Sequence, residues 1–172
     1  MVNGMKSANE VFLFELAAMQ DIEREARSIL GLLIGARVHN DTLKRIIEDM
    51  ASASNQHLER IDSCLRHLGT APLQTRSAPI RGVQEDFQDF LRAPHNDAVR
   101  DLFALNTAQR ITKLAIAGYE HLTDWATIIG AVTCTQCLLK NLVEKTETSQ
   151  QLRKLNQTLS EQLLATAAPA RS

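Results

Sequence analysis

The sequence predicts an all-α protein, a four-helix bundle with a long crossover that carries a short helix. The composition favours long helices over sheets, because the chain has only 7 Gly, 4 Pro and 4% aromatic residues. Four segments carry apolar residues at alternating steps of three and four, which places each set on one face of a helix. Each stripe has polar residues near its midpoint, so the four helices together predict a polar layer at the centre of the bundle.

The size and charge of the chain indicate one soluble domain. The 172 residues suffice for a single core, and the hydrophobic fraction of 44% and charged fraction of 23% are ordinary for a globular protein. The formal net charge is -1, so nothing indicates nucleic acid or an anionic membrane as a partner. We expect the bundle to occupy residues 8–164, between an N-terminal lead (residues 1–7) and a flexible tail (residues 165–172).

The cytoplasm is the location that the sequence favours. No segment approaches the roughly 20 apolar residues of a membrane span. The apolar run from Val11 to Phe14 is interrupted by Glu15, and no small-residue cleavage site follows, so we expect no signal peptide. Three cysteines are an odd number, which argues against a disulfide framework and for a reducing compartment.

The first helix is expected from about residue 8 to about 37, after a capping box formed by Ser7 and Glu10. A buried acid costs several kcal/mol unless it is paired or bound to a cation, so Glu23 in the middle of this stripe needs a partner. The alternative is a stripe that reaches the surface at that point. The inward stripe is Phe12, Leu16, Met19, Glu23, Ala26, Leu30 and Leu33.

The second helix is expected from about residue 41 to about 68. Asn40, Asp41 and Thr42 are turn and cap residues, and such a short link makes the first two helices antiparallel neighbours. Gly69 suits the left-handed position that follows a helix end. The middle of the stripe is again polar, and its members are Leu43, Ile47, Met50, Ser54, His57, Ile61, Cys64 and Leu68.

Residues 70–96 are expected to form the crossover, because Pro72, Pro79, Gly82 and Pro94 are spread through them. A short helix suits the apolar residues between these breakers, which are Val83, Phe87, Phe90 and Leu91. A crossover of this length lets the second and third long helices run parallel. We expect the 70–79 loop and the tail after about residue 165 to be the most mobile parts of the chain.

The third long helix is expected to begin after a cap at Asn96 or Asp97 and to end near residue 129, before Gly130. Its inward row is Leu105, Ala108, Thr112, Ala115, Tyr119, Leu122, Ala126 and Ile129. The fourth is expected from about residue 132 to about 164. Its row has a lysine at the middle and reads Leu138, Leu142, Lys145, Ser149, Leu152 and Leu159.

Four stretches in chain order carry a family pattern: Val11-Phe12 with Leu16 and Glu23; Leu58-Glu59-Arg60-Ile61-Asp62; Val99-Arg100-Asp101 with Gln109 and Tyr119; and Leu142-Val143-Glu144-Lys145 with Leu152. These frames resemble the YciE/YciF family, ferritin-like bacterial proteins linked to stress responses that carry a domain of unknown function. The resemblance covers nearly the whole chain and implies a ferritin-like four-helix bundle.

The resemblance also implies a metal centre, because in that superfamily carboxylates and histidines from four helices hold two ions, and oxygen ligands with imidazole suit iron or manganese. This chain departs from the family pattern at positions where the family frames carry acids. The acids of the family frames are replaced at Ser52, Ala53, Thr112, Ala115 and Lys145. Only a vestigial metal set remains, made of Glu23, His57 and Glu144.

We therefore expect no bound cofactor and a polar network in place of the metal. In this network the ammonium group of Lys145 replaces the cation, and His57 with nearby hydroxyl groups satisfies the Glu23 carboxylate. The residues assigned to this middle layer are Glu23, Ser54, His57, Thr112, Lys145 and Ser149.

The sequence favours a non-catalytic, degenerate member of a stress-associated family that acts by self-association, for example as a dimer, or by binding a protein partner. No phosphate loop, nucleophile motif or cofactor motif supports an enzyme. The alternative is a metal-binding protein, an iron or manganese oxidase or a metal-handling protein, with a rearranged site built on Glu23, His57 and Glu144.

The remaining reactive side chains are expected to be structural. Cys134 and Cys137 form a Cys-x-x-Cys pair without the preceding strand of a redox motif or the second pair of a zinc site, so with Cys64 we expect buried thiols. Trp125 is expected either at the rim of the core or on a dimer surface. We expect the following side chains to lie in solvent or to point away from the middle layer: His39, His67, His95, His121, Glu120 and Asp124.

Overall fold

The computed structural model describes residues 4–70 and 75–167, with side chains placed up to residue 165. In these ranges every regular element is a helix, in the order α1 (Ala8–Gly35), α2 (Asp41–His67), α3 (Ala78–Leu91), α4 (Asp97–Ile128) and α5 (Val132–Ala167). The predicted boundaries of the four long helices lie within about three residues of these bounds, the ordinary scatter for helix ends.

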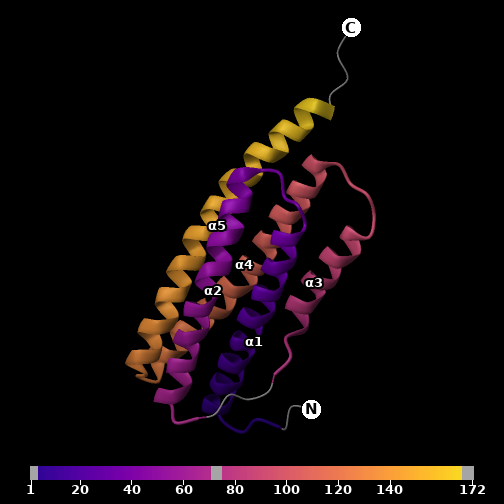
Figure 1. Ribbon diagram of the computed structural model, residues 1–172. Helices are drawn as coiled ribbons and strands as arrows, with labels where there is room; N and C mark the ends of the chain where they lie inside the picture. Colours follow the sequence, from indigo (N-terminus) through magenta and orange to yellow (C-terminus); the bar gives the residue numbers. More distant parts are fainter. Residues whose placement is uncertain (1–3, 71–74, 168–172) are drawn as a thin grey trace.

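The four long helices form a bundle in which each packs against two antiparallel neighbours (Figure 1). Helix α1 packs against α2 and α4, and α5 packs against the same two helices from the opposite corner. The crossover carries α3 back along the bundle, so α2 and α4 run parallel across one diagonal while α1 and α5 face each other across the other. The predicted all-α bundle with a crossover helix is confirmed, and α3 lies outside it against α4 and α1.

The helix ends follow the predicted capping chemistry with one difference. Asn40 and Asn96 accept the amides of Leu43 and Val99 through their side chains, both at 2.9 Å. At the start of α1 the Ser7 hydroxyl accepts the Glu10 amide, but the Glu10 carboxylate accepts the amide of Lys6 rather than that of Ser7 as a capping box requires.

Two glycines end helices as predicted, because they take the left-handed backbone that favours this residue. Gly69 after α2 has a φ of 65° and Gly130 after α4 has a φ of 72°.

The crossover is anchored earlier than the sequence predicted. Helix α3 already begins at Ala78, and the amide of Ser77 donates to the Asp21 carboxylate at 2.7 Å. Arg81 of α3 pairs with Glu25 of α1 at 3.1 Å. Residues 165–167 of the predicted tail belong to α5, and residues 71–74 and 168–172 of the predicted mobile segments lie outside the described ranges.

The predicted inward rows are buried in α1 and, apart from the half-buried Leu68, in α2. Three positions are corrected in the other helices, and one of them, Leu159 of α5, is only half-buried against the core. Ile129 is 42% exposed, because α4 ends at Ile128 and the chain turns there. In α5 the inward residue is Asn141 and not Leu142, which is only half-buried. The buried row of α5 is therefore Cys134, Leu138, Asn141, Lys145, Ser149 and Leu152.

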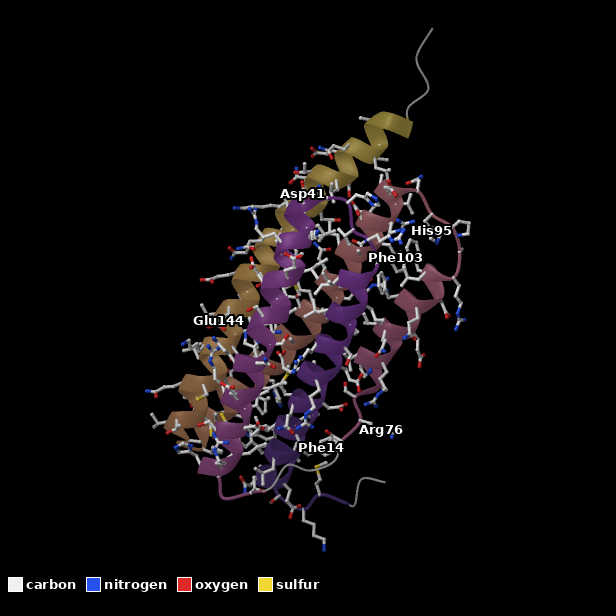
Figure 2. All side chains as sticks on the ribbon, viewed as in Figure 1. Phe14, Asp41, Arg76, His95, Phe103 and Glu144 are labelled. Atoms are coloured by element: carbon white, nitrogen blue, oxygen red, sulfur yellow. The ribbon has the colours of Figure 1, made fainter. Side chains whose placement is uncertain are left out.

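Among the histidines outside the middle layer, one differs from the prediction. His95 is half-buried rather than solvated, because its ring stacks on Phe90 with centroids 3.8 Å apart and its Nε2 contacts the Phe90 carbonyl oxygen at 2.8 Å. Figure 2 shows it near Phe103, which stacks on the same Phe90 ring. Trp125 packs edge-on against Phe12 at the rim of the core.

Candidate functional site

The centre of the bundle is built around Glu23, a carboxylate with 0% exposure. The Tyr119 hydroxyl of α4 donates to its Oε1 at 2.9 Å, and the Lys145 ammonium of α5 donates to its Oε2 at 3.0 Å. Nδ1 of His57 on α2 lies 3.7 Å from the same Oε2. All four long helices therefore place a side chain at this one carboxylate.

Lys145 reaches Glu23 across the diagonal of the bundle, and its side chain is only 8% exposed. Burial alone would favour the protonated acid, but the charge of Lys145 and the contacts of His57 outweigh it and lower the pKa of Glu23 to about 2. Glu23 is thus ionised at neutral pH, and the two opposite charges compensate each other in the interior.

A second chain of contacts links α5 to α2. Asn141 donates through Nδ2 to the Tyr119 hydroxyl at 2.9 Å and to the His57 carbonyl oxygen at 3.1 Å. Its Oδ1 accepts from Arg60 at 2.7 Å, and Arg60 also donates to Glu144 Oε2 at 2.6 Å. The contact between Glu144 Oε2 and His57 Nε2 at 3.0 Å closes a ring of polar contacts around the centre.

The charges in this ring shift two further groups. Burial opposes ionisation of Glu144, but its contacts with Arg60 and His57 prevail and lower its pKa. Burial and the neighbouring Glu23 carboxylate raise the pKa of Tyr119 well above its usual value, so its hydroxyl stays protonated and donates to Glu23.

His57 stands between the two acids with its ring nitrogens facing different carboxylates. Nε2 carries a proton when it bonds to the Glu144 carboxylate, because a carboxylate only accepts. Nδ1 is buried and has no hydrogen-bond partner among the described residues.

The structure brings together four of the residues predicted for the site, namely Glu23, His57, Glu144 and Lys145. The predicted hydroxyl donors are wrong, because Ser54 and Thr112 donate to the carbonyl oxygens of Met50 and Ala108 on their own helices. Such bonds to the preceding helical turn are a common alternative for buried Ser and Thr. Ser149 is buried in the same row but makes no hydrogen bond to Glu23.

Three members of the network were not predicted. Tyr119 stands in the predicted inward row of the third long helix, but nothing in the sequence indicates that its hydroxyl group donates to Glu23. Arg60 lies in the Leu58–Asp62 frame, and Asn141 lies one residue before the position that the periodic pattern favoured. A buried asparagine between inward-facing Leu138 and Lys145 is the signal that could have been found, because steps of three and four join all three.

The donor set does not fit a pair of divalent metal ions. Two such ions need bridging carboxylates, but the replaced positions supply serine, alanine, threonine and lysine. Glu23 and Glu144 are already paired with protein cations, and they contact opposite nitrogens of the His57 ring, so the three do not converge on one ion. Among the described residues no group of three or more His, Cys, Asp or Glu side chains could hold a metal.

The three thiols lie together at the end of α2 and the start of α5. Cys64 and Cys134 are buried as predicted, and each sulfur contacts the other residue's carbonyl oxygen, at 3.8 Å and 3.6 Å. Burial and the neighbouring thiols raise the pKa of Cys64, and burial also raises that of Cys134. The raised pKa values keep Cys64 and Cys134 protonated, and protonated thiols are poor nucleophiles. Cys137, also expected to be buried, is only half-buried against the core.

The fold and the centre define a class of protein, an antiparallel four-helix bundle with an outer crossover helix and a charge-paired core. The chain belongs to the family described as a domain of unknown function (DUF892), whose model matches residues 7–165. This match, together with the structural neighbours, confirms the resemblance to the YciE/YciF family. A comparison with curated protein sequences finds no match.

Three solved structures share the fold at low sequence identity. The Escherichia coli stress protein YciF is 22% identical with a TM-score of 0.85, over 91% of this chain and 99% of that one. YcfI of Rhodopseudomonas palustris, given as a candidate structural protein, is 20% identical with a TM-score of 0.83, over 89% and 97%. A protein of Xanthomonas campestris is 18% identical with a TM-score of 0.71, over 91% and 95%.

None of the helices in the described ranges combines the length and the hydrophobicity needed to cross a membrane.

Proposed function

We propose that this protein is a non-catalytic member of its family that acts in the cytoplasm by self-association, with a lysine in place of the metal. The observation that carries the first part is the buried contact between Lys145 and Glu23 at 3.0 Å. A metal ion at Glu23 would have to displace the ammonium group and leave it buried without its counter-ion, which is strongly unfavourable. The stress association of a family relative, E. coli YciF, supports a similar setting for this chain.

The outer face of α5 supports the second part. Of the large apolar side chains that are exposed in the described residues, a group gathers on the α4–α5 turn and the first turns of α5. Val132, Leu139 and Val143 are 66%, 47% and 49% exposed, and their spacing puts them on one outward stripe. Ile128 and Ile129 extend the stripe across the turn, at 79% and 42% exposed. Exposed apolar patches of this kind mark interaction surfaces.

A second copy of the chain is the occupant that the stripe fits. A two-fold axis near Leu138 would place Val132 of each copy against Val143 of the partner subunit in an antiparallel pair of α5 helices. Gln136, the polar residue within the stripe, carries no charge, so its burial in the dimer costs little if it is hydrogen-bonded.

Sedimentation velocity across a concentration series tests the self-association. We expect the wild-type chain to dimerise and Leu139→Glu to raise the dissociation constant by about 100-fold, because the interface would bury an unpaired charge. Gln88→Glu is the matched control, since it adds the same charge to an exposed position of α3, which packs against α1 and α4 and lies away from the stripe. A wild-type chain that remains monomeric at all concentrations would contradict self-association.

A further inference from the structure

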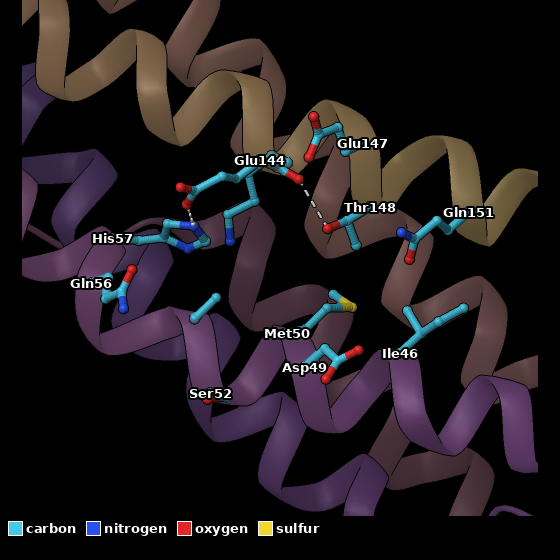
Figure 3. Close-up of a pocket in the computed structure, with 12 residues that line it drawn as sticks. Ile46, Asp49, Met50, Ser52, Gln56, His57, Glu144, Glu147, Thr148 and Gln151 are labelled. Carbon is cyan, nitrogen blue, oxygen red and sulfur yellow. Dashed lines mark hydrogen bonds and ion pairs between the residues drawn. The ribbon is translucent and has the colours of Figure 1, made fainter.

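The seam between α2 and α5 has a regular antiparallel register. His57 of α2 contacts Glu144 of α5, with Nε2 and Oε2 3.0 Å apart (Figure 3). One helical turn further along the seam, Arg60 donates to Oδ1 of Asn141 at 2.7 Å. The step forward on α2 is matched by an equal step back on α5, so the register also indicates which residues oppose each other at the next turn.

Continuing this register by one turn places two cysteines opposite each other. Cys64 lies four residues after Arg60, and Cys137 lies four residues before Asn141. The two helices are close here, because the sulfurs of Cys64 and Cys134 each lie within 3.8 Å of the other residue's carbonyl oxygen. Burial and then the Cys134 and Cys137 thiols raise the pKa of Cys64, so Cys64 adjoins both thiols of α5.

The three thiols differ in how far solvent reaches them. Cys64 and Cys134 are 0% and 1% exposed, whereas Cys137 is half-buried, so an oxidant from solution meets Cys137 first. Cys134 is a poor partner for it, because both lie in the first turns of α5 and a bond between them would deform the helix. Cys137 shares a side of α5 with Glu144, seven residues on, and therefore faces α2 rather than the outward stripe.

We propose that Cys137 and Cys64 form a disulfide that joins α5 to α2 when the protein is exposed to a peroxide. In the first step the Cys137 sulfur attacks hydrogen peroxide, the O–O bond breaks, and the sulfur becomes a sulfenic acid while one water leaves. In the second step the Cys64 sulfur attacks the Cys137 sulfur, so that an S–S bond forms and the S–O bond breaks. The hydroxyl group leaves with the Cys64 thiol proton as a second water. The two thiols lose two electrons, and one peroxide gains them.

The bond has two consequences for the molecule. It forms within one chain, so it does not depend on self-association. It also closes a long loop that contains α3 and α4, which restricts the unfolded chain and raises the stability of the bundle. The second step is the slower one, because the Cys64 thiol is protonated at neutral pH.

Peptide mapping of the oxidised wild-type protein tests the pairing. The reduced protein is treated with hydrogen peroxide, free thiols are alkylated, and an unreduced digest is analysed by mass spectrometry. We expect a linked pair of peptides that carry Cys64 and Cys137, and alkylation of Cys134 alone instead of all three thiols. Absence of this linked pair from the folded protein, or a bond of Cys137 to Cys134 or to a second chain, would overturn the proposal.

Two variants test the role of each buried thiol. Cys64→Ala should abolish the link and leave a sulfenic acid on Cys137, which dimedone labels. Cys134→Ala is the matched control, since it removes a buried thiol of the same cluster and should form the link as the wild type does. A link that still forms in Cys64→Ala would overturn the assignment of Cys64.

Thermal unfolding followed by circular dichroism checks that both reduced variants keep the fold and measures the effect of the bond. The oxidised wild-type protein should unfold about 5–10 °C above the reduced protein, and the oxidised Cys134→Ala variant should show the same increase. A linked protein that unfolds at a lower temperature than the reduced one would show that the two sulfurs do not meet in the native bundle.

Discussion

Glu23 and Lys145 contribute to stability as a pair rather than as two separate charges. Each is buried, and each is the counter-ion of the other across the bundle. Removing one partner leaves an uncompensated charge, while removing both leaves a neutral interior, so the two kinds of variant should behave differently.

Lys145→Met is expected to destabilise the protein by about 3–5 kcal/mol, because the charge of Glu23 would remain buried without its cation. Combining it with Glu23→Gln should recover part of that loss, since the glutamine can still accept from Tyr119. Urea unfolding of the wild type, the two single variants and the double variant measures this coupling. A neutral Lys145→Met would mean that the ammonium group contributes nothing to the core.

The lowered pKa of Glu23 also predicts how stability depends on pH. In the unfolded chain this carboxyl has a pKa near 4.5, and in the folded protein the pKa is about 2. The pair's contribution is therefore complete above pH 4.5 and is lost as the pH falls through the folded pKa. The lost contribution should be about 3 kcal/mol, because each unit of the difference between the unfolded and folded pKa of Glu23 corresponds to about 1.36 kcal/mol.

The measurement is the difference in unfolding free energy between the wild type and the Glu23→Gln, Lys145→Met double variant across this pH range. Other carboxylates titrate in both proteins and cancel in the difference. A difference that stays constant from pH 5 to pH 2 would show that Glu23 is not held ionised in the fold.

The contact of Lys145 with Glu23 could be predicted because helical periodicity placed both residues at the middle of inward rows. The network around them could not be predicted in the same way. Neighbouring positions such as Asn141 and Leu142 differ by about 100° around the helix, and an apolar pattern fixes the inward direction no better than that. The apolar pattern also could not show that the hydroxyl groups of Ser54 and Thr112 donate to carbonyl oxygens of their own helices.

At the scale of elements, Asp101 ties the connection between α1 and α2 to helix α4. Its carboxylate on α4 accepts the amides of His39 and Asn40 at 2.8 Å and 2.7 Å, which fixes the turn between α1 and α2. The Val99-Arg100-Asp101 frame marked this residue in the sequence, but its partner was unknown because the contact joins residues about sixty positions apart. Helix ends, by contrast, were predictable because caps depend on adjacent residues.

Asp101→Asn should destabilise the protein by about 2 kcal/mol, since one carboxylate oxygen becomes an amide group that cannot accept an N–H. Thermal unfolding followed by circular dichroism measures the change. Asp97→Asn is the control, because Asp97 is exposed on the same helix and its ion pairs with His39 and Arg100 are surface contacts of about 0–1 kcal/mol. Equal effects of the two substitutions would contradict the role assigned to Asp101.

At the scale of the whole molecule, the bundle has the all-α architecture that the family resemblance implied. The fold was predictable because four amphipathic stripes and one proline-rich crossover leave few arrangements. Its interior is held by side chains of its own, with the Lys145 ammonium group as the counter-ion of the Glu23 carboxylate.

Metal analysis of protein purified without chelator tests that account most directly. The wild-type chain should contain no stoichiometric iron, manganese or zinc, whereas Ala53→Glu, Ala115→Glu and Lys145→Glu together should create a metal-binding centre with Glu23 and Glu144. The variant with the two alanine substitutions alone keeps the ammonium group and should not bind. Two metal ions per chain in the wild-type protein would contradict the replacement of the metal by Lys145.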